Sequence, residues 1–257
     1  DLYTEVVNYE EMKDLQRSFF KSQIPDQDYP QDIAYISMLY KFARKHKIKH
    51  ILNGGNYSTE CCREPEEWGG YLGVDTWLVN DIHKKFGKIK LKNFPLVDIL
   101  TYKFIYKYIY GIRSEYLLNY VPYTRELAEN TLMELYGCEK FQHKHHESRF
   151  TRFYEDYWLP KKFGFDKRKA HFSSLIMTGQ MTRDIALERL KKPELNKDFL
   201  EKEFEYVADK LDFSNEEFKE IFLAPNKTYK NYNNKKKIIF LGARILRFLG
   251  LEKRLFR

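Results

Sequence analysis

The chain has 257 residues, enough for one large domain or two small ones with a substantial core. Aromatic side chains make up 17% of it, which excludes global disorder. The net charge is +8, but residues 235–257 hold eight Lys/Arg against one Glu, so +7 belongs to the tail and +1 to residues 1–234. A body with so little net charge argues against a nucleic-acid partner.

The cysteines and the hydropathy exclude two further classes of protein. Cys61, Cys62 and Cys138 are too few and too poorly spaced for a disulfide framework or a closed zinc site, so we expect no metal centre. No window reaches the roughly 20 apolar residues that a membrane span requires. We therefore expect a cytoplasmic protein.

The first part of the chain predicts alternating strands and helices. Residues 2–7 are predicted to form an apolar strand, and since no initiator Met precedes it we expect a chain cut inside a fold. Asn8 begins a helix that continues to Phe20, and residues 31–47 have helical spacing. A short strand over 49–52 follows. Strand, helix and strand in this order predict a βαβ unit with parallel pairing.

The alternation continues to about residue 138 and then becomes helical. The pattern predicts a helix over 74–86 ended by Gly87, a strand over 89–97, an aromatic helix over 98–110, a helix over 122–136 ended by Gly137, and helices from His145 to about Phe222. The predicted class is α/β: a partial Rossmann-like parallel sheet in residues 1–138, a helical substrate and catalytic region in 139–222, and a basic tail in 223–257.

A glycine-rich loop follows the strand at 49–52. In open parallel sheets, ligands bind beyond the carboxyl ends of the strands, where glycine lets the backbone approach a nucleotide. The candidate nucleotide-binding residues are Gly54, Gly55, Asn56, Thr59 and Glu60. The alternative is that the two glycines only make a tight turn.

The most distinctive stretch runs from residue 145 to 187 and mixes histidines, cations and aromatics. His143, His145, His146 and Glu147 could ligate zinc or iron, but their spacing matches no helix-borne metal site. We favour a role in binding phosphate or carboxylate, or in acid–base catalysis, over metal ligation. An exposed loop without such a role is the alternative. The cations of the stretch could clamp phosphates or form a solvated face: Lys161, Lys162, Lys167, Arg168 and Lys169.

The tail predicts a basic amphipathic helix. Residues 235–237 are all lysine, and the apolar residues of 238–256 can share one stripe flanked by arginines. This composition suits an anionic membrane surface or a groove on a partner. Packing against the body is the alternative.

In combination these segments resemble one family, the bacterial N-acetyl sugar amidotransferases of lipopolysaccharide, O-antigen and flagellin-glycan biosynthesis. The resemblance covers residues 1 to about 190, and its longest segment is too idiosyncratic for chance agreement. The segments are, in order, DLYTEVV, EEMKDLQ, IPDQDYPQD, ILNGGNYSTE, KFGKIKLKNFP, LNYVPY and ESRFTRFYEDYWLPKKFGFDKRKAHFSSLIMTGQMTRDIAL.

The resemblance implies the PP-loop ATP-pyrophosphatase class and an adenine-nucleotide alpha-hydrolase-like fold. It implies that ATP and Mg²⁺ activate the acetamido oxygen of a nucleotide-linked sugar by adenylation, and that ammonia then displaces AMP to give an acetamidino group. It also implies two partners that supply the ammonia, a HisH-like glutaminase and a HisF-like cyclase.

One departure from the family pattern concerns the phosphate loop. The family's SGGxDS motif occurs nowhere in the 257 residues, and in the family it lies upstream of the segment that matches Asp1. In the family, the phosphate loop supplies the backbone N–H groups that cradle pyrophosphate. We expect this chain to be a fragment of a longer enzyme that does not hydrolyse ATP alone; the alternative is a truncated relative with only a binding role.

The leading hypothesis is that the chain is the catalytic and sugar-binding portion of an ATP-dependent sugar amidotransferase, and it gives each candidate group a role. His145, His146, Glu147, Arg149 and Arg152 line the acceptor or ammonia side as catalytic residues, while Lys167, Arg168 and Lys169 meet phosphates. Two other functions stay open: a tRNA-modifying PP-loop enzyme, and a non-catalytic scaffold that docks the glutaminase and, through residues 235–257, the inner face of the membrane.

Overall fold

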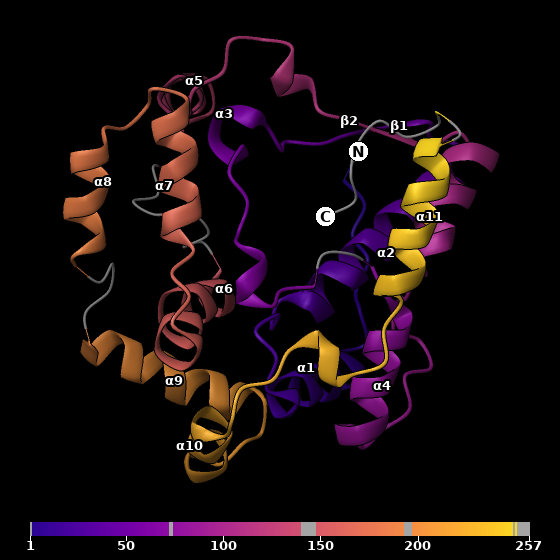
Figure 1. Cartoon of the computed structure of the whole chain (residues 1–257), viewed down its shortest axis with the longest axis vertical. Helices are drawn as coiled ribbons and strands as arrows, with labels where there is room; N and C mark the ends of the chain where they lie inside the picture. Colours follow the sequence, from indigo (N-terminus) through magenta and orange to yellow (C-terminus); the bar gives the residue numbers. More distant parts are fainter. Residues whose placement is uncertain (1, 72–73, 140–147, 193–196, 249, 251–257) are drawn as a thin grey trace. The chain divides into compact units, whose positions relative to one another are not determined.

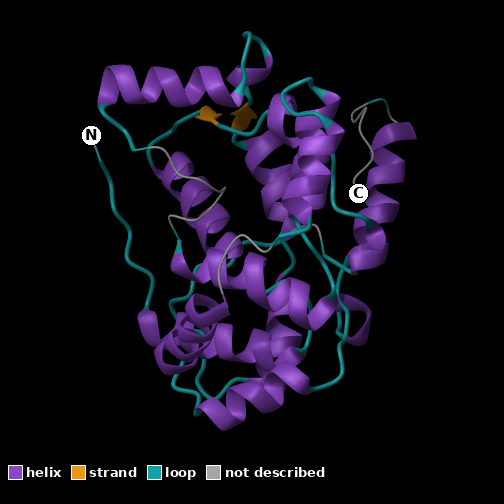
Figure 2. Cartoon of the chain, turned by 90° about the vertical axis from the view of Figure 1, so that its left-hand side faces the viewer, coloured by secondary structure: helices purple, strands orange, loops and turns teal. Residues whose placement is uncertain are grey.

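The structure is a computed structural model that describes residues 2–71, 74–139, 148–192, 197–248 and 250. The described chain is mostly helical, with a single pair of short strands (Figure 2). It divides into two compact units by packing: unit 1 comprises residues 1–47, 69–111 and 224–257, and unit 2 comprises 48–68 and 112–223. The boundaries predicted at residues 138 and 222 separate regions by their expected roles. The division by packing does not test them, so they stay a prediction.

Every regular element in the described part of unit 1 is a helix or helical turn (Figure 1). Its elements are α1 (Tyr9–Ser22), α2 (Tyr29–Lys45), α4 (Thr76–Phe86), the π-helix η2 (Thr101–Ile109), the 3-10 turn η5 (Tyr229–Asn231) and α11 (Lys236–Phe248). As predicted, Asn8 caps α1, its side chain accepting from the N–H of Glu11 at 3.0 Å, and α4 ends at Gly87. The core of the unit forms where α1 packs on α4 and buries Leu15, Phe19, Leu78 and Ile82.

The strand predicted over residues 89–97 is wrong. This segment is a loop, because carboxylates of α1 hold its backbone N–H groups. Asp14 accepts from the N–H of Ile89 at 3.2 Å, and Glu11 accepts from the N–H of Phe94 at 2.6 Å. Donors engaged in this way are not available to a neighbouring strand.

The strand predicted over residues 2–7 is also wrong. These residues pair with no strand among the described residues, and the ring of Tyr3 packs instead on α2, 4.9 Å from the ring of Phe42. The predicted βαβ unit with the strand at 49–52 therefore does not form.

Unit 2 contains both strands and the remaining helices. Its elements are β1 (His50–Leu52), α3 (Tyr57–Glu60), η1 (Glu66–Trp68), β2 (Arg113–Glu115), η3 (Leu117–Asn119), α5 (Arg125–Tyr136), α6 (Arg149–Phe153), the π-helix η4 (Tyr154–Phe163), α7 (Arg168–Met177), α8 (Arg183–Leu190), α9 (Lys197–Lys210) and α10 (Asn215–Leu223). As predicted, α5 ends at Gly137, which adopts φ 62°.

β1 does pair in parallel, but with a strand that the sequence pattern did not reveal. Ile51 lies opposite Ser114, and Leu52 lies opposite Glu115. β2 is only three residues long and polar, so it carries neither the apolar run nor the alternation from which strands are predicted. The described sheet is therefore much smaller than the predicted Rossmann-like sheet, while the predicted helical region is confirmed.

The aromatic residues of the distinctive stretch form the core of unit 2. The fully buried rings of Phe153 and Trp158 pack with Phe204 of α9 and Phe218 of α10, and the ring centroids of Phe204 and Phe218 are 4.6 Å apart. Packed aromatic pairs of this kind add to the stability that area burial provides. The density of aromatics in this segment thus has a structural cause.

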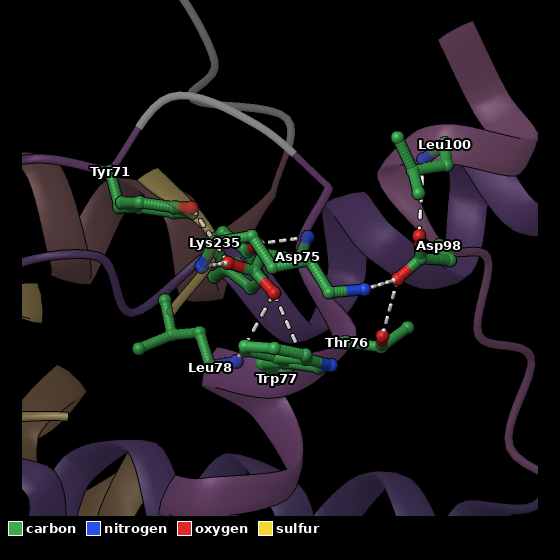
Figure 3. A network of polar contacts seen from close by, with 9 residues as sticks. Tyr71, Asp75, Thr76, Trp77, Leu78, Asp98, Leu100 and Lys235 are labelled. Atoms are coloured by element: carbon green, nitrogen blue, oxygen red, sulfur yellow. Dashed lines mark hydrogen bonds and ion pairs between the residues drawn. The ribbon is translucent and has the colours of Figure 1, made fainter. Parts of the chain in front are cut away.

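The beginning of the tail packs into unit 1. The N–H of Lys227 donates to the carbonyl of Gln23 at 2.9 Å, and the hydroxyl of Tyr232 donates to the carbonyl of Ser22 at 2.7 Å. Lys235 is buried, its N–H donating to Asp75 at 2.5 Å and its ammonium pairing with Asp98 (Figure 3). The segment that leads into the predicted basic helix is therefore packed on the body.

Candidate functional site

The glycine-rich loop lies at the carboxyl end of the parallel strand pair in unit 2. The N–H of Asn53 donates to the carbonyl of Glu115 at 2.9 Å, so the loops that follow the two strands leave the same edge of the sheet. Gly55 lies against Tyr116, since an added Cβ would be 3.1 Å from the Tyr116 ring. The position beyond the strand ends that binds ligands in parallel sheets is thus occupied by this loop.

The predicted nucleotide-binding residues form a small internal network. Asn56 is buried, and its side-chain oxygen accepts from the N–H of Thr59 at 2.9 Å and from its hydroxyl at 3.1 Å. The N–H of Gly55 donates to the side chain of Asn53 at 2.8 Å. Gly54 and Glu60 are exposed. The side chain of Asn56 therefore caps α3 instead of offering its polar atoms to a ligand.

The end of α7 and the turn after it hold α3 in place. The side-chain amide of Gln180 donates to the carbonyl of Ser58 at 2.8 Å, and the hydroxyl of Thr178 donates to the same carbonyl at 2.8 Å. The N–H of Cys62 donates to the buried hydroxyl of Ser174 at 2.9 Å. The sequence reasoning missed these three positioning residues, although all lie inside the longest family-like segment.

Gln180 also reaches a second helix. Its side-chain oxygen accepts from the N–H of Arg125 at 2.8 Å, at the first residue of α5. A single side chain thus joins α3, the start of α5 and the end of α7. Nothing in the residue type signals this role, because a glutamine between two helices is ordinarily solvated.

The predicted phosphate-binding cations lie at the other end of α7. Lys167 immediately precedes α7, whereas α3 contacts Thr178 just after it, so roughly 16 Å of helix separates the two ends. Lys167 pairs with Glu155 at 3.3 Å and with Glu64 at 3.5 Å. The structure does not bring these cations to the glycine loop.

Arg168 braces this end of unit 2. Its guanidinium donates to both oxygens of Asp166, at 2.7 Å in the shortest bond, and to the carbonyls of Arg189 and Lys192 at 3.3 Å and 2.8 Å. A guanidinium that donates in so many directions favours a structural role over phosphate binding. Lys169 is exposed.

The two predicted catalytic arginines share one buried carboxylate. Glu203 of α9, whose side chain is 3% exposed, accepts from Arg149 at 2.7 Å and pairs with Arg152 at 3.5 Å. Each guanidinium also lies over an aromatic ring, Arg149 over Tyr206 and Arg152 over Phe199. Hydrogen bonding to Glu203 raises the pKa of Arg149. The cluster ties α6 to α9, because both arginines of α6 contact Glu203 of α9.

The remaining catalytic predictions, His145, His146 and Glu147, lie outside the described residues, as does His143. Among the described residues there is no group of three or more His, Cys, Asp or Glu side chains arranged to hold a metal ion. The described part of the chain likewise has no helix with the length and apolar content needed to cross a bilayer.

The described residues do not fit a triphosphate with its Mg²⁺. The N–H of Gly55 and the amide of Asn56 are used within the loop, so the loop forms no nest of converging N–H groups. The predicted phosphate-binding cations Lys167, Arg168 and Lys169 stand at the far end of α7. The glycine loop therefore offers no cradle of N–H groups to a phosphate.

Lys162, from the same basic stretch, turns toward the end of α10. Its ammonium donates to the carbonyls of Ile221 at 3.1 Å and Phe222 at 2.7 Å. A cation in this position satisfies the last carbonyls of a helix and complements its dipole. Burial lowers the pKa of Lys162 to about 8.

We expect the stability contributed by Lys162 to rise between pH 8 and 10.5. Below this window the folded and unfolded chains both hold the proton. Within it the folded chain releases the proton, while the unfolded chain, with its ordinary pKa of 10.5, still binds it, so folding becomes more favourable. Solvent screening of this partly exposed group limits the gain to about 1 kcal/mol.

The measurement is urea unfolding of the wild type and of Lys162→Met at the two ends of this window. The difference in free energy of unfolding should shift by that amount in favour of the wild type as the pH rises. Lys161→Met removes the same charge from an exposed neighbour. A shift of equal size in that variant would contradict the assignment to Lys162.

Comparison with protein families gives one match. Residues 147–246 match the family model described as LPS biosynthesis protein WbpG-like, C-terminal domain. The matched stretch contains the arginine–glutamate cluster, all of α7 and Gln180, and it reaches into α11. It supports the lipopolysaccharide-biosynthesis part of the resemblance. Comparisons with curated proteins and with solved structures gave no match.

Proposed function

We propose that this chain is the acceptor-binding part of an ATP-dependent amidotransferase of lipopolysaccharide biosynthesis. The reaction converts the acetamido group of a nucleotide-linked sugar to an acetamidino group, ammonia replacing the amide oxygen while ATP is cleaved to AMP and pyrophosphate. The observation that carries the proposal is the match of residues 147–246 to the C-terminal domain of LPS biosynthesis proteins.

The geometry of the glycine loop supports a nucleotide-linked substrate. The loop lies beyond the ends of two parallel strands, where nucleotides bind in α/β proteins. Gly55 lets the backbone approach the half-exposed ring of Tyr116, and an aromatic face of this kind can stack on a base. The matched segment itself holds α3, which follows this loop, through Ser174, Thr178 and Gln180.

The proposal assigns ATP and Mg²⁺ to a phosphate loop outside these 257 residues. The sequence contains no SGGxDS motif, and the described residues do not fit a triphosphate. A parallel pair of strands is also an unusual sheet by itself, because parallel strands ordinarily lie within larger sheets covered on both faces. We propose that further strands of the Rossmann-like sheet, together with the phosphate loop, complete it.

The test is an assay of the enzyme that includes the phosphate loop. With ATP, Mg²⁺, a nucleotide-linked N-acetylhexosamine and isotope-labelled ammonium, we expect one labelled nitrogen in the sugar and one AMP for each amidine formed. The 257-residue chain alone should form no AMP from ATP. Absence of label from the sugar while ATP is cleaved would contradict the proposed acceptor.

The contribution of the glycine loop can be tested in the same assay. Gly55→Ala forces Tyr116 to move, so we expect KM for the nucleotide-linked sugar to rise roughly tenfold. Gly242→Ala is the matched control, since a Cβ there meets nothing within 4 Å. The ammonia suppliers, a HisH-like glutaminase and a HisF-like cyclase, belong to the same proposal and should replace free ammonium when glutamine is given.

One observation favours the alternative of a docking scaffold. None of the side chains of α5 is buried, and Leu132, Leu135 and Tyr136 are among its exposed apolar residues. Glutaminase binding without amidine formation would support the scaffold over the enzyme. No observation favours the tRNA-modifying alternative.

A further inference from the structure

We propose that α11 binds the surface of an anionic phospholipid membrane. The occupant of its exposed face is then a bilayer of phosphatidylglycerol type, and the helix lies along the bilayer surface. This inference concerns a helix that takes no part in the proposed chemistry, and it stands whether or not that function is correct.

One face of α11 is packed against unit 1. Ala243 is buried, and the side chains one turn away on the same face, those of Ile239 and Leu246, are partly buried. Lys236 turns toward this side, where its ammonium contacts the hydroxyl of Tyr229. The helix is thus attached to the body, and the rest of its surface is presented outward.

The outward surface carries an apolar stripe. Ile238, Leu241, Ile245 and Phe248 follow one another at spacings of three and four residues, so they share one side of the helix. All four are exposed; Leu241 is 60% exposed and Phe248 92%. Large apolar side chains in a continuous exposed stripe mark an interaction surface.

The cations of α11 lie beside this stripe. Lys237, Arg244 and Arg247 are exposed, and their helical positions adjoin the apolar side. The sequence of α11 contains no Asp or Glu, and residues 235–257 carry a net +7. An apolar stripe edged by cations matches the acyl boundary and the negative headgroups of an anionic bilayer.

The same charges argue against a second copy of the chain as the occupant. In a two-fold contact the same patch faces itself, so the cations of one α11 would approach those of the other. Like charges brought together in this way oppose association. A membrane of opposite charge relieves the conflict, because arginine and lysine can reach the headgroups while the stripe enters the interface.

The start of α11 is fixed by a buried clamp (Figure 3). The backbone N–H of Lys235 donates to Asp75, and its ammonium pairs with Asp98, which also accepts from the hydroxyl of Thr76 at 2.8 Å. The pairing with Lys235 and the bond from Thr76 lower the pKa of Asp98 against the opposing effect of its burial. With its first turn held in this way, the helix binds lipid without first having to be ordered.

The experiment is co-sedimentation of the 257-residue chain with vesicles. We expect binding to vesicles of phosphatidylcholine with phosphatidylglycerol, weakening as salt is added, and little binding to phosphatidylcholine alone. Arg244→Glu with Arg247→Glu should reduce the partition coefficient at least thirtyfold, on the order expected for two cations. Leu241→Ser with Ile245→Ser should reduce it by a comparable factor, roughly thirtyfold, at constant charge.

Matched controls place the same changes elsewhere. Lys202→Glu with Lys219→Glu alters the net charge equally at exposed positions of α9 and α10, and Leu135→Ser removes an exposed leucine from α5. Both controls should bind as the wild type does. Equal loss in the charge control, or no binding to anionic vesicles at low salt, would overturn the proposal. So would a dimer in light scattering that Leu241→Ser dissociates, because the occupant would then be a second copy.

Discussion

Replacement of Asp75 by alanine is expected to lower the free energy of unfolding of unit 1 by about 3–5 kcal/mol. The Asp75 side chain is fully buried and accepts from the hydroxyl of Tyr71 at 2.6 Å, from the N–H of Trp77 at 2.7 Å and from the N–H of Lys235 at 2.5 Å. Its loss leaves these donors buried without acceptors and removes the N-cap of α4.

The chemistry of Tyr71 strengthens this expectation. Burial, and next the hydrogen bond to Asp75, raise the pKa of Tyr71, so its hydroxyl stays protonated and remains a donor at any working pH. The network of Figure 3 also joins three distant parts of the chain, the loop before α4, the segment at Asp98 and the start of α11. Loss of Asp75 should therefore loosen α4 and the base of α11 together.

Urea unfolding measures the change in free energy of unfolding. Hydrogen exchange of peptides that cover α4 measures the loosening of that helix. Asp75→Asn keeps one acceptor for the first turn of α4 and should lose about half as much stability. Thr124→Ala removes the exposed N-cap of α5 and should cost about 1 kcal/mol. A loss of that small size in Asp75→Ala would show that the network contributes no more than a helix cap.

Replacement of Glu203 by alanine is expected to lower the free energy of unfolding of unit 2 by about 3–5 kcal/mol, because it leaves the guanidiniums of Arg149 and Arg152 without their buried counter-charge. Arg149→Ala should cost only about 1 kcal/mol, because Arg149 is 48% exposed and Arg152 still pairs with the carboxylate. Hydrogen exchange in α6 and α9 would report both effects.

These variants also separate the two roles of Arg149. If Arg149 only braces α6, activity of the complete enzyme should follow stability, and Arg149→Lys should restore part of both. If Arg149 contacts the acceptor, as the sequence predicts, Arg149→Ala should lower kcat/KM by tenfold or more while the free energy of unfolding changes by about 1 kcal/mol. A role in bracing α6 alone would then not account for the loss of activity.

The sequence predicted the elements whose signals are local. The cap at Asn8, the end of α4 at Gly87 and the end of α5 at Gly137 lie within a few residues of the turns that they terminate. The apolar strand at residues 50–52 was also predicted, although the partner predicted for its parallel pairing, residues 2–7, was wrong. The longest family-like segment pointed to the stretch that matches LPS biosynthesis proteins. These signals depend on a residue and its near neighbours, so they can be read along the chain.

Only the tertiary structure decided which distant groups meet. Residues 89–97 have the composition of a strand but become a loop, because Glu11 and Asp14 bind N–H groups of this segment from α1. The partner of β1 is a polar segment more than sixty residues away. Arg149, Arg152 and Arg168 are predicted to bind ligands, and the structure adds that Glu203 and Asp166 pair with them within the fold. A charge has the same appearance in sequence whether its partner is a ligand or a buried carboxylate, and packing alone distinguishes the two.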